Sequence, residues 1–188
     1  MPFVSRAGQK LDHAMNEFRI DVKDKVCADL GCSTGGFVDC LLQRGAKTVY
    51  AVDTGYGVLD WKLRNDPRVQ VYERTNAMHV KFSEAIELIT IDVAWTRQKN
   101  ILPHARELLE IDGEIVTLIK PHYEAEQSQL RKGILPEELI EPIVSKVLES
   151  IRELRFDIKD TTRSPILGAK GNVEVLAHLQ MPEVICSA

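Results

Sequence analysis

Short apolar runs alternate with amphipathic stretches along most of this chain. Runs with the length and turn signals of strands occur at 26–28, 48–53, 69–73, 86–93 and 114–120. Apolar side chains with helical spacing occur among them, at 5–18, 37–42, 101–109 and 136–154, and 59–64 could form a short helix. Strands that alternate with helices predict an α/β fold with a mostly parallel sheet and helices on both faces.

The last third of the chain departs from this alternation. Strands are predicted in succession at 155–162 and 172–180, joined by a turn at 164–171. Such a pair favours a hairpin, which would give the sheet an antiparallel edge. Residues 122–135 lack periodicity and are interpreted as a loop. The 188 residues contain no linker or repeat, so we predict one domain over 1–181 and a frayed tail over 182–188.

A glycine-rich turn follows the first predicted strand. Residues 29–37 read D-L-G-C-S-T-G-G-F, and their glycines allow close backbone approaches that a side chain would block. Thr34 is expected to cap the following helix, whose free N–H groups suit an anionic or polar ligand. Asp53 ends the next strand, where nucleoside-binding α/β folds place the carboxylate that holds ribose hydroxyls. A strand–turn–helix without a ligand is the alternative.

The turn does not have the spacing of a dinucleotide site. The second glycine of G-x-G-x-x-G allows the pyrophosphate to approach, and Ser33 stands at that position in this chain. This disfavours a nicotinamide-dependent oxidoreductase. The turn is similar instead to the S-adenosylmethionine loop of Rossmann-like methyltransferases.

Composition and charge restrict the class of protein, its expected location and its possible partners. With 44% hydrophobic and 28% charged residues, the chain is typical of a soluble protein, and it has neither a membrane-length apolar run nor the apolar core of a signal peptide. The cytoplasm is therefore expected. The four cysteines include no C-x-x-C pair and are interpreted as core thiols. A net charge of −4 argues against a large RNA footprint but allows a local basic patch.

Four ionisable residues lie in or at the ends of the predicted elements. Lys10 lies on the first helix, Asp92 and Lys120 follow central strands, and Glu174 falls inside an apolar strand. Lysine and glutamate are seldom buried without partners, so a lysine partner would explain Glu174. On spacing alone, an edge strand with Glu174 facing water is favoured.

This Lys-Asp-Lys-Glu order resembles the catalytic tetrad of the FtsJ family of RNA ribose 2′-O-methyltransferases, and most closely its haemolysin A (TlyA) branch. No one matching segment is specific, but the ordered set is. The segments are S-R-A-G-Q-K-L at 5–11, D-L-G-C-S-T-G-G-F at 29–37, V-D-T-G-Y-G-V-L at 52–59, D-P-R-V at 66–69, E-R-T-N-A at 73–77, L-I-K-P at 118–121 and K-G-N-V-E at 170–174. The resemblance implies a single Rossmann-like methyltransferase domain that uses S-adenosylmethionine and acts on ribosomal RNA or a ribosomal subunit.

The resemblance also implies residue roles. It makes Lys10, Asp92, Lys120 and Glu174 catalytic. It makes cofactor contacts of Asp29, Gly31, Ser33, Gly35, Gly36, Phe37, Asp53 and Asn76. A ribose 2′-hydroxyl is a poor nucleophile, and we expect Lys120, its pKa lowered by burial and by Lys10, to remove its proton. Asp92 would orient Lys120, Glu174 would orient Lys10 or the hydroxyl, and no metal is required.

Two features depart from the family pattern. Full-length members of this branch usually carry a small RNA-binding domain before the first helix, and the chain starts just ahead of Ser5, so we expect no such domain. The segment after Asp92 is not rich in serine and phenylalanine. Its Trp95, Arg97 and Lys99 could stack on a base and touch phosphate, or could form a drifted surface loop.

These departures keep other interpretations open. Arg6, four residues before Lys10, is a further candidate for substrate contact, with solvated surface charge as its alternative. A cofactor-binding or RNA-binding protein with weakened catalysis remains an alternative function. A membrane-active haemolysin is less supported, because no basic amphipathic helix is present. The sequence leaves the oligomeric state open.

Overall fold

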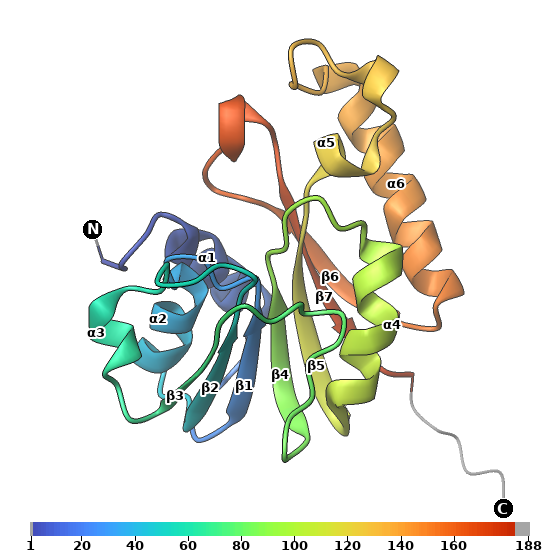
Figure 1. Cartoon of the computed structure of the whole chain (residues 1–188). Coiled ribbons are helices and arrows are strands. Elements are labelled where there is room, and N and C mark those ends of the chain that lie inside the picture. The colour runs from blue at the N-terminus through green and yellow to red at the C-terminus, as the bar shows by residue number, and fades with distance from the viewer. Residues whose placement is uncertain (1, 183–188) are drawn as a thin grey trace, which may run out of the picture.

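Seven strands form one sheet in the computed structural model, which describes residues 2–182. Their order across the sheet is β3-β2-β1-β4-β5-β7-β6 (Figure 1). The strands are β1 (Val26–Leu30), β2 (Thr48–Val52), β3 (Val69–Tyr72), β4 (Ile86–Ile91), β5 (Leu109–Ile119), β6 (Asp157–Arg163) and β7 (Val175–Gln180). Most of the tail predicted to fray, 183–188, lies outside the described residues.

Strand direction agrees with the sequence prediction. Strands β1 to β5 pair in parallel, whereas β7 pairs antiparallel with both β5 and β6. The chain proceeds outward from β1 through β2 to β3 and then returns to β4 on the other side of β1. A reversal of this kind opens a crevice at the carboxyl ends of β1 and β4. The mostly parallel sheet with an antiparallel edge is confirmed.

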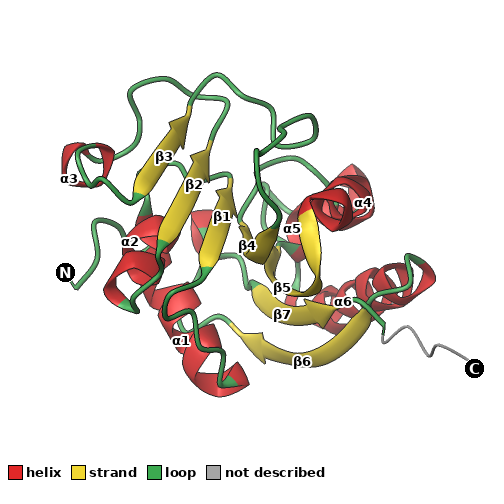
Figure 2. Ribbon diagram, turned by 90° about the horizontal axis from the view of Figure 1, so that it is seen from below, coloured by secondary structure: helices red, strands yellow, loops and turns green. Residues whose placement is uncertain are grey.

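Helices cover both faces of the sheet, as predicted (Figure 2). On one face, α1 (Ala7–Phe18), α2 (Gly36–Gln43) and α3 (Trp61–Arg64) pack in a core that includes Leu11 and Leu41. On the other face, α4 (Gln98–Leu108) and α6 (Glu137–Glu153) pack in a core that includes Ile101 and Ile151. Neighbouring residues of central strands alternate between these cores because side chains along a strand point to opposite faces. No helix among residues 2–182 is long and apolar enough to cross a membrane.

The loop predicted over 122–135 is wrong in part. It contains α5 (Pro121–Glu124) and the 3-10 turn η1 (Gln127–Gln129). Pro121 stands at the start of α5, where its fixed φ suits a helix and its missing N–H is not needed. Another 3-10 turn, η2 (Ala169–Gly171), lies between β6 and β7.

The boundary between α4 and β5 also differs from the prediction. The helix ends at Leu108, and the strand begins at Leu109 rather than at Glu114. The pairing of β4 with β5 is shifted between Ile86 and Leu88. A Cβ atom at Gly113 would lie 2.6 Å from the Leu109 side chain and 3.0 Å from the Ile86 carbonyl oxygen. Glycine therefore allows the irregular backbone in this part of the sheet.

Two local predictions around the site are corrected. Thr34 does not cap α2, whose N-cap is Gly35 at φ 99° with no side-chain hydrogen bond. Glu174 does not lie inside a strand, because β7 begins at Val175. That strand lies between β5 and β6, so the alternative of an exposed edge strand is also wrong.

Candidate active site

Two adjoining cavities lie at the carboxyl ends of β1, β2 and β4, where the sheet order reverses. Their volumes are about 230 and 330 Å³, and both are lined by Gly31, Ser33, Asp92 and Ala94. The smaller one is also lined by Ser5, Ala7, Asp29, Cys32, Phe37 and Lys120. The larger one is also lined by Val52, Asp53, Thr54, Thr75, Asn76, Ala77, Met78, Val93, Trp95, Thr96 and Ile101. Together they form an elongated cleft over the first strand–helix turn.

The glycine turn brings β1 against the segment after β4. The Gly31 and Cys32 N–H groups both donate to the Val52 carbonyl, at 2.9 and 3.0 Å. Gly31 has a φ of 92°, and a Cβ atom there would lie 2.7 Å from the carbonyl oxygen of Asp92. Both the positive φ and this close approach require glycine at position 31. The absence of a side chain lets Asp92 lie directly beside the turn.

Asp53 ties together the loops on both sides of the larger cavity. Its Oδ2 accepts the Ser33 N–H at 2.8 Å, and its Oδ1 accepts the Gly55 N–H at 2.7 Å. These two hydrogen bonds fix the orientation of the Asp53 carboxylate. The acidic end of β2 predicted from the sequence therefore lies on the wall of the cleft.

Asp29 places a deeply buried carboxyl against the smaller cavity. It is 1% exposed, and its Oδ1 accepts a hydrogen bond from the Thr90 hydroxyl at 2.8 Å. Its Oδ2 has no hydrogen-bond partner among residues 2–182. Burial, with the negative charges of Asp92 and Asp53 as further causes, raises the pKa of Asp29 to about 8. A cationic ligand in this cavity would compensate for the burial of that carboxyl.

The four predicted catalytic residues form two lysine–carboxylate pairs, of which Lys120–Asp92 lines the smaller cavity. Lys120 Nζ lies 2.5 Å from Asp92 Oδ1 and donates to the Val93 carbonyl at 3.1 Å. Lys10 on α1 forms an ion pair with Glu174, and their side chains are only 11% and 3% exposed. The structure therefore pairs four residues that are far apart along the chain, each lysine with one acid.

The antiparallel register of β5 and β7 makes these pairs neighbours, because Ile119, just before Lys120, lies opposite Val175, just after Glu174. His122 lies two residues after Lys120. Its pKa is lowered to about 4, by burial first and then by the positive charges of Lys120 and Lys10. His122 is uncharged at neutral pH, and its Nδ1 has no hydrogen-bond partner among the described residues.

Two of the predicted cofactor contacts, Gly35 and Gly36, line neither cavity. A Cβ atom at Gly35 would meet the side chains of Leu63 and Leu59 at 2.3 and 2.7 Å. At Gly36 it would meet Ser5 Oγ at 2.3 Å and the backbone nitrogen of Gly8 at 2.7 Å. These glycines lie where α3 and α1 pack closely against the start of α2. Asp29, Gly31, Ser33, Phe37, Asp53 and Asn76 do line the cleft.

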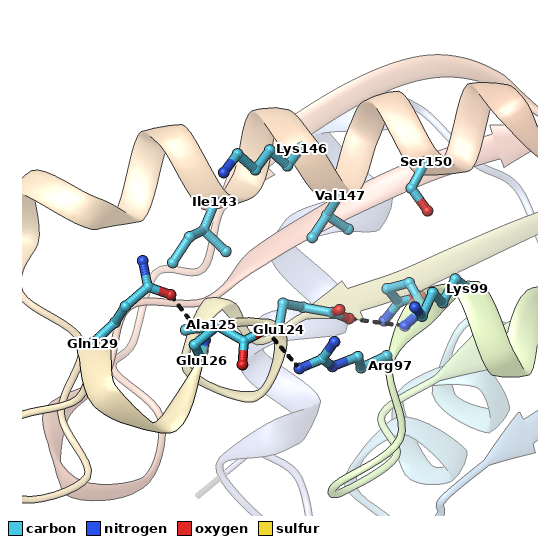
Figure 3. Close-up of a pocket in the computed structure, with 11 residues that line it drawn as sticks. Arg97, Lys99, Glu124, Ala125, Glu126, Gln129, Ile143, Lys146, Val147 and Ser150 are labelled. Atoms are coloured by element: carbon cyan, nitrogen blue, oxygen red, sulfur yellow. Dashed lines mark hydrogen bonds and ion pairs between the residues drawn. The ribbon is translucent and has the colours of Figure 1, made fainter.

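The residues predicted to contact the substrate do not lie together in one site. Trp95 lines the larger cavity, is 83% exposed and stacks on Tyr123 with ring centroids 4.6 Å apart. Arg97 and Lys99 line a different cavity of about 270 Å³, bounded by α6 (Figure 3). Arg97 lies 3.8 Å from Glu126 there. Arg6 is exposed and immediately precedes α1.

Sequence reasoning missed several residues of the cleft. Thr75 and Ala77 lie on either side of Asn76 in the segment E-R-T-N-A, which the resemblance had already singled out. Ser5 and Ala7 lie in S-R-A-G-Q-K-L, and both line the smaller cavity. His122 directly follows L-I-K-P. The signal in each case was proximity to a recognised motif.

The sheet order, the glycine turn and an acidic residue at the end of β2 define a Rossmann-like methyltransferase domain. The model of the FtsJ-like methyltransferases matches residues 3–181. The chain therefore belongs to the FtsJ-like methyltransferase family, whose cofactor is S-adenosylmethionine.

Similar proteins cover nearly all of the chain. The chain is 44% identical to YqxC of Bacillus subtilis, named as a candidate rRNA methyltransferase, over 96% of its own length and 66% of YqxC. It is 38% identical to the 16S/23S rRNA (cytidine-2′-O)-methyltransferase TlyA of Mycobacterium tuberculosis, over 95% of its length and 68% of TlyA. The chain thus spans about two thirds of the length of these relatives.

A solved structure agrees closely with the fold. The crystal structure of a candidate hemolysin from Lactococcus lactis has a TM-score of 0.91 and 42% identity, with 95% of this chain and 88% of that chain covered. The arrangement of the sheet and helices is therefore shared with a relative of similar sequence.

Proposed function

We propose that this chain transfers a methyl group from S-adenosylmethionine to a ribose 2′-hydroxyl of ribosomal RNA, with 1–181 as the methyltransferase domain. The observation that carries the proposal is the pairing of Lys120 with Asp92 and of Lys10 with Glu174, at the neighbouring ends of β5 and β7. The rRNA 2′-O-methyltransferase activity named for TlyA of M. tuberculosis supports it. The substrate is then RNA or a ribosomal subunit, and the cytoplasm is the corresponding location.

The cleft has groups that suit each part of the cofactor. Asp53 lies where a carboxylate would hold the ribose hydroxyls, and Asn76 lies on the same wall for the adenine. Asp29 lines the smaller cavity, which would receive the charged amino-acid portion, and its Oδ2 has no hydrogen-bond partner among residues 2–182. When bound, S-adenosylmethionine supplies an electrophilic methyl on a positively charged sulfur.

The chain's own residues would prepare the acceptor. Lys120 borders the smaller cavity, where its amine could remove the proton of a ribose hydroxyl or stabilise the charge that develops on its oxygen. Asp92 holds that amine in place through the 2.5 Å contact. Lys10 adds a second positive charge nearby, and Glu174 fixes its position. The proposed removal of the hydroxyl proton requires no group other than these four side chains.

Methyl transfer to ribosomal particles tests the proposal. We expect labelled S-adenosylmethionine to label ribosomal RNA or an intact subunit, with the label mapping to a ribose. Lys120→Ala should abolish the labelling while leaving the affinity for S-adenosylmethionine nearly unchanged. A wild-type protein that binds the cofactor but labels no ribosomal RNA or subunit would instead support a cofactor-binding protein without this activity.

A further inference from the structure

A third cavity adjoins the larger cavity of the candidate cofactor cleft. Its volume is about 570 Å³, and Trp95 is common to this cavity and the larger cofactor cavity. His122 and Tyr123, just after Lys120, form another part of its wall. The cavity therefore adjoins the cofactor cleft at Trp95, and its Tyr123 ring lies 5.6 Å from Lys120 Nζ.

The lining of this cavity is cationic although the whole chain is acidic. The two cofactor cavities, the cavity at Arg97 and a cavity at Glu110 and Asp112 are each lined by at least two carboxylates, whereas this one is lined by none. It is lined instead by Lys132 and Lys170, both exposed and neither in an ion pair among residues 2–182. An anionic ligand would meet two uncompensated amines and no repelling acid.

The opposite wall is aromatic and apolar. Trp95 and Tyr123 stack with an angle of 28° between their rings, and Leu130 also lines the cavity. Trp95 is held at φ 60°, an uncommon conformation for a residue other than glycine that persists only where the surroundings enforce it. Aromatic surfaces of this kind stack on nucleobases.

Buried polar groups make the cavity a formed site rather than a surface hollow. The neutral His122 on its wall is 7% exposed, with an Nδ1 that no described residue satisfies. Asn172, 3% exposed, fastens the two segments that carry the lysines. Its Nδ2 donates to the carbonyls of Gly133 and Ala169, both at 3.0 Å, and its Oδ1 accepts the Leu135 N–H at 3.0 Å.

We propose that this cavity binds one nucleotide of the acceptor RNA strand, with its base on the Trp95–Tyr123 face and its phosphate at Lys132 and Lys170. This proposal rests on the proposed function for the identity of the strand. A base can enter only when it is unpaired, so the site selects a single-stranded or flipped-out nucleotide. One ring nitrogen of the neutral His122 can donate or accept a hydrogen bond at the base edge, depending on the tautomer.

Binding of free nucleotides tests the cavity without any methyl transfer. Cytidine 5′-monophosphate and cytidine would be titrated into the whole chain in the presence of S-adenosylhomocysteine, with the NMR signals of Trp95 and Tyr123 followed. We expect both compounds to shift these signals and the phosphate to strengthen binding. Lys132→Ala with Lys170→Ala should abolish the advantage of the phosphate, and Lys159→Ala, at an exposed position on β6, should keep it. Absence of shifts, or an unchanged phosphate advantage in the double variant, would overturn the proposal.

Kinetics with RNA separate this inference from the proposed function. The double variant should raise KM for RNA and leave cofactor affinity unchanged, and the slope of log KM against log salt should fall by about 0.7 for one lost single-strand phosphate contact. If wild-type protein methylates RNA and the double variant has the same KM and slope, the cavity is not part of the RNA site although the function stands. If wild-type protein methylates nothing, the nucleotide titration alone decides the cavity.

Discussion

At the scale of single residues, the candidate site contains buried charged side chains that compensate one another in ion pairs. Lys10 and Glu174 are only 8% and 3% exposed as whole residues, and each has the other as its ion-pair partner. Removal of one partner from a buried pair leaves a charge without compensation, whereas replacement of both by apolar side chains is often nearly neutral for stability. Structural and catalytic contributions of this pair can therefore be separated.

Glu174→Ala alone should lower the free energy of unfolding by about 3–5 kcal/mol, because it strands the Lys10 ammonium in the interior. The double variant Lys10→Met with Glu174→Leu should recover most of that stability and still fail to transfer methyl groups. Denaturant unfolding and the methyl-transfer assay measure the two effects. An active double variant would show that the pair serves stability alone.

Asp29 should make the stability of the protein depend on pH. Its pKa is raised from an ordinary value of 3.8 to about 8, so between these values the folded state holds a proton that the unfolded state has lost. This contribution to stability is complete below about pH 4 and is lost progressively as pH rises to about 8. Asn at position 29 cannot titrate, so Asp29→Asn should flatten the decrease in unfolding free energy over this interval. An unchanged slope would contradict the assignment.

The same carboxyl should link cofactor binding to proton release. S-adenosylmethionine carries a net positive charge, which favours the ionised form of Asp29 when bound nearby. At pH 7 most Asp29 is protonated in the free protein, because its pKa is about 8. Calorimetry in buffers of different ionisation enthalpy should show protons released on binding by the wild-type protein and fewer by Asp29→Asn. Equal proton release by both proteins would place the cationic part of the cofactor elsewhere.

At the scale of elements, close packing of two helices positions one of the lysines. A Cβ atom at Gly36 would lie 2.7 Å from the backbone nitrogen of Gly8, so α1 can rest on the start of α2 only because glycine stands there. Lys10 lies on α1 near this contact. The position of its amine therefore depends on a helix–helix contact next to Ser5 and Ala7, which line the smaller cavity.

Gly36→Ala should displace α1 and reduce kcat more than it weakens cofactor binding. A shift of about 1 Å in a catalytic group can cost about a hundredfold in rate. Gly45→Ala is the matched control, because Gly45 has a φ of 91° but its Cβ would meet only Lys23, at 3.5 Å or more. Both variants should lose stability, and only Gly36→Ala should lose rate at saturating cofactor. Equal losses of rate would show that stability explains the effect.

The sequence predicted the elements well and their junctions poorly. Strands such as β2 and β4 were recognisable because apolar residues fill most of their length, and the hairpin of β6 and β7 followed from two strands in succession. Helix α5 was missed because a single turn shows no periodicity. The early start of β5 was missed because 110–112 are exposed and lack the pattern of a buried strand.

The candidate site was likewise predicted only in part: its residues were named, but their contacts were not. The resemblance named Lys10, Asp92, Lys120 and Glu174, but nothing in the chain order says which lysine pairs with which acid. The helical contact of Gly36 depends on a residue far upstream, and the separation of Arg97 from Trp95 depends on where α4 begins. These are consequences of tertiary packing, which periodicity and motif spacing do not contain.

At the scale of the whole molecule, the cavities proposed for the cofactor and for RNA adjoin each other at Trp95 and differ in charge. The cofactor cleft is bordered by Asp29, Asp53 and Asp92, and the adjoining cavity by Lys132 and Lys170. The acidic cleft thus favours a cationic methyl donor, and the adjoining cavity favours an anionic RNA strand. The net charge of −4 is compatible with RNA binding because the relevant charge is local.

A ligand that fills the cofactor cleft should stabilise the entire domain, because the cleft joins loops that follow β1, β2 and β4. Binding to the folded state alone adds about 2.7 kcal/mol when the ligand is present at about 100 times its Kd. For a chain of this size each kcal/mol raises Tm by about 2–4 °C, so S-adenosylmethionine should raise Tm by about 5–11 °C.

NAD should leave Tm unchanged, because Ser33 replaces the glycine that a pyrophosphate requires. Asp53→Ala should greatly reduce the shift, since Asp53 also holds the Ser33 and Gly55 backbone in place. A rise in Tm with NAD but not with S-adenosylmethionine would show that the cleft does not hold the methyl donor, and it would refute the proposed chemistry as well.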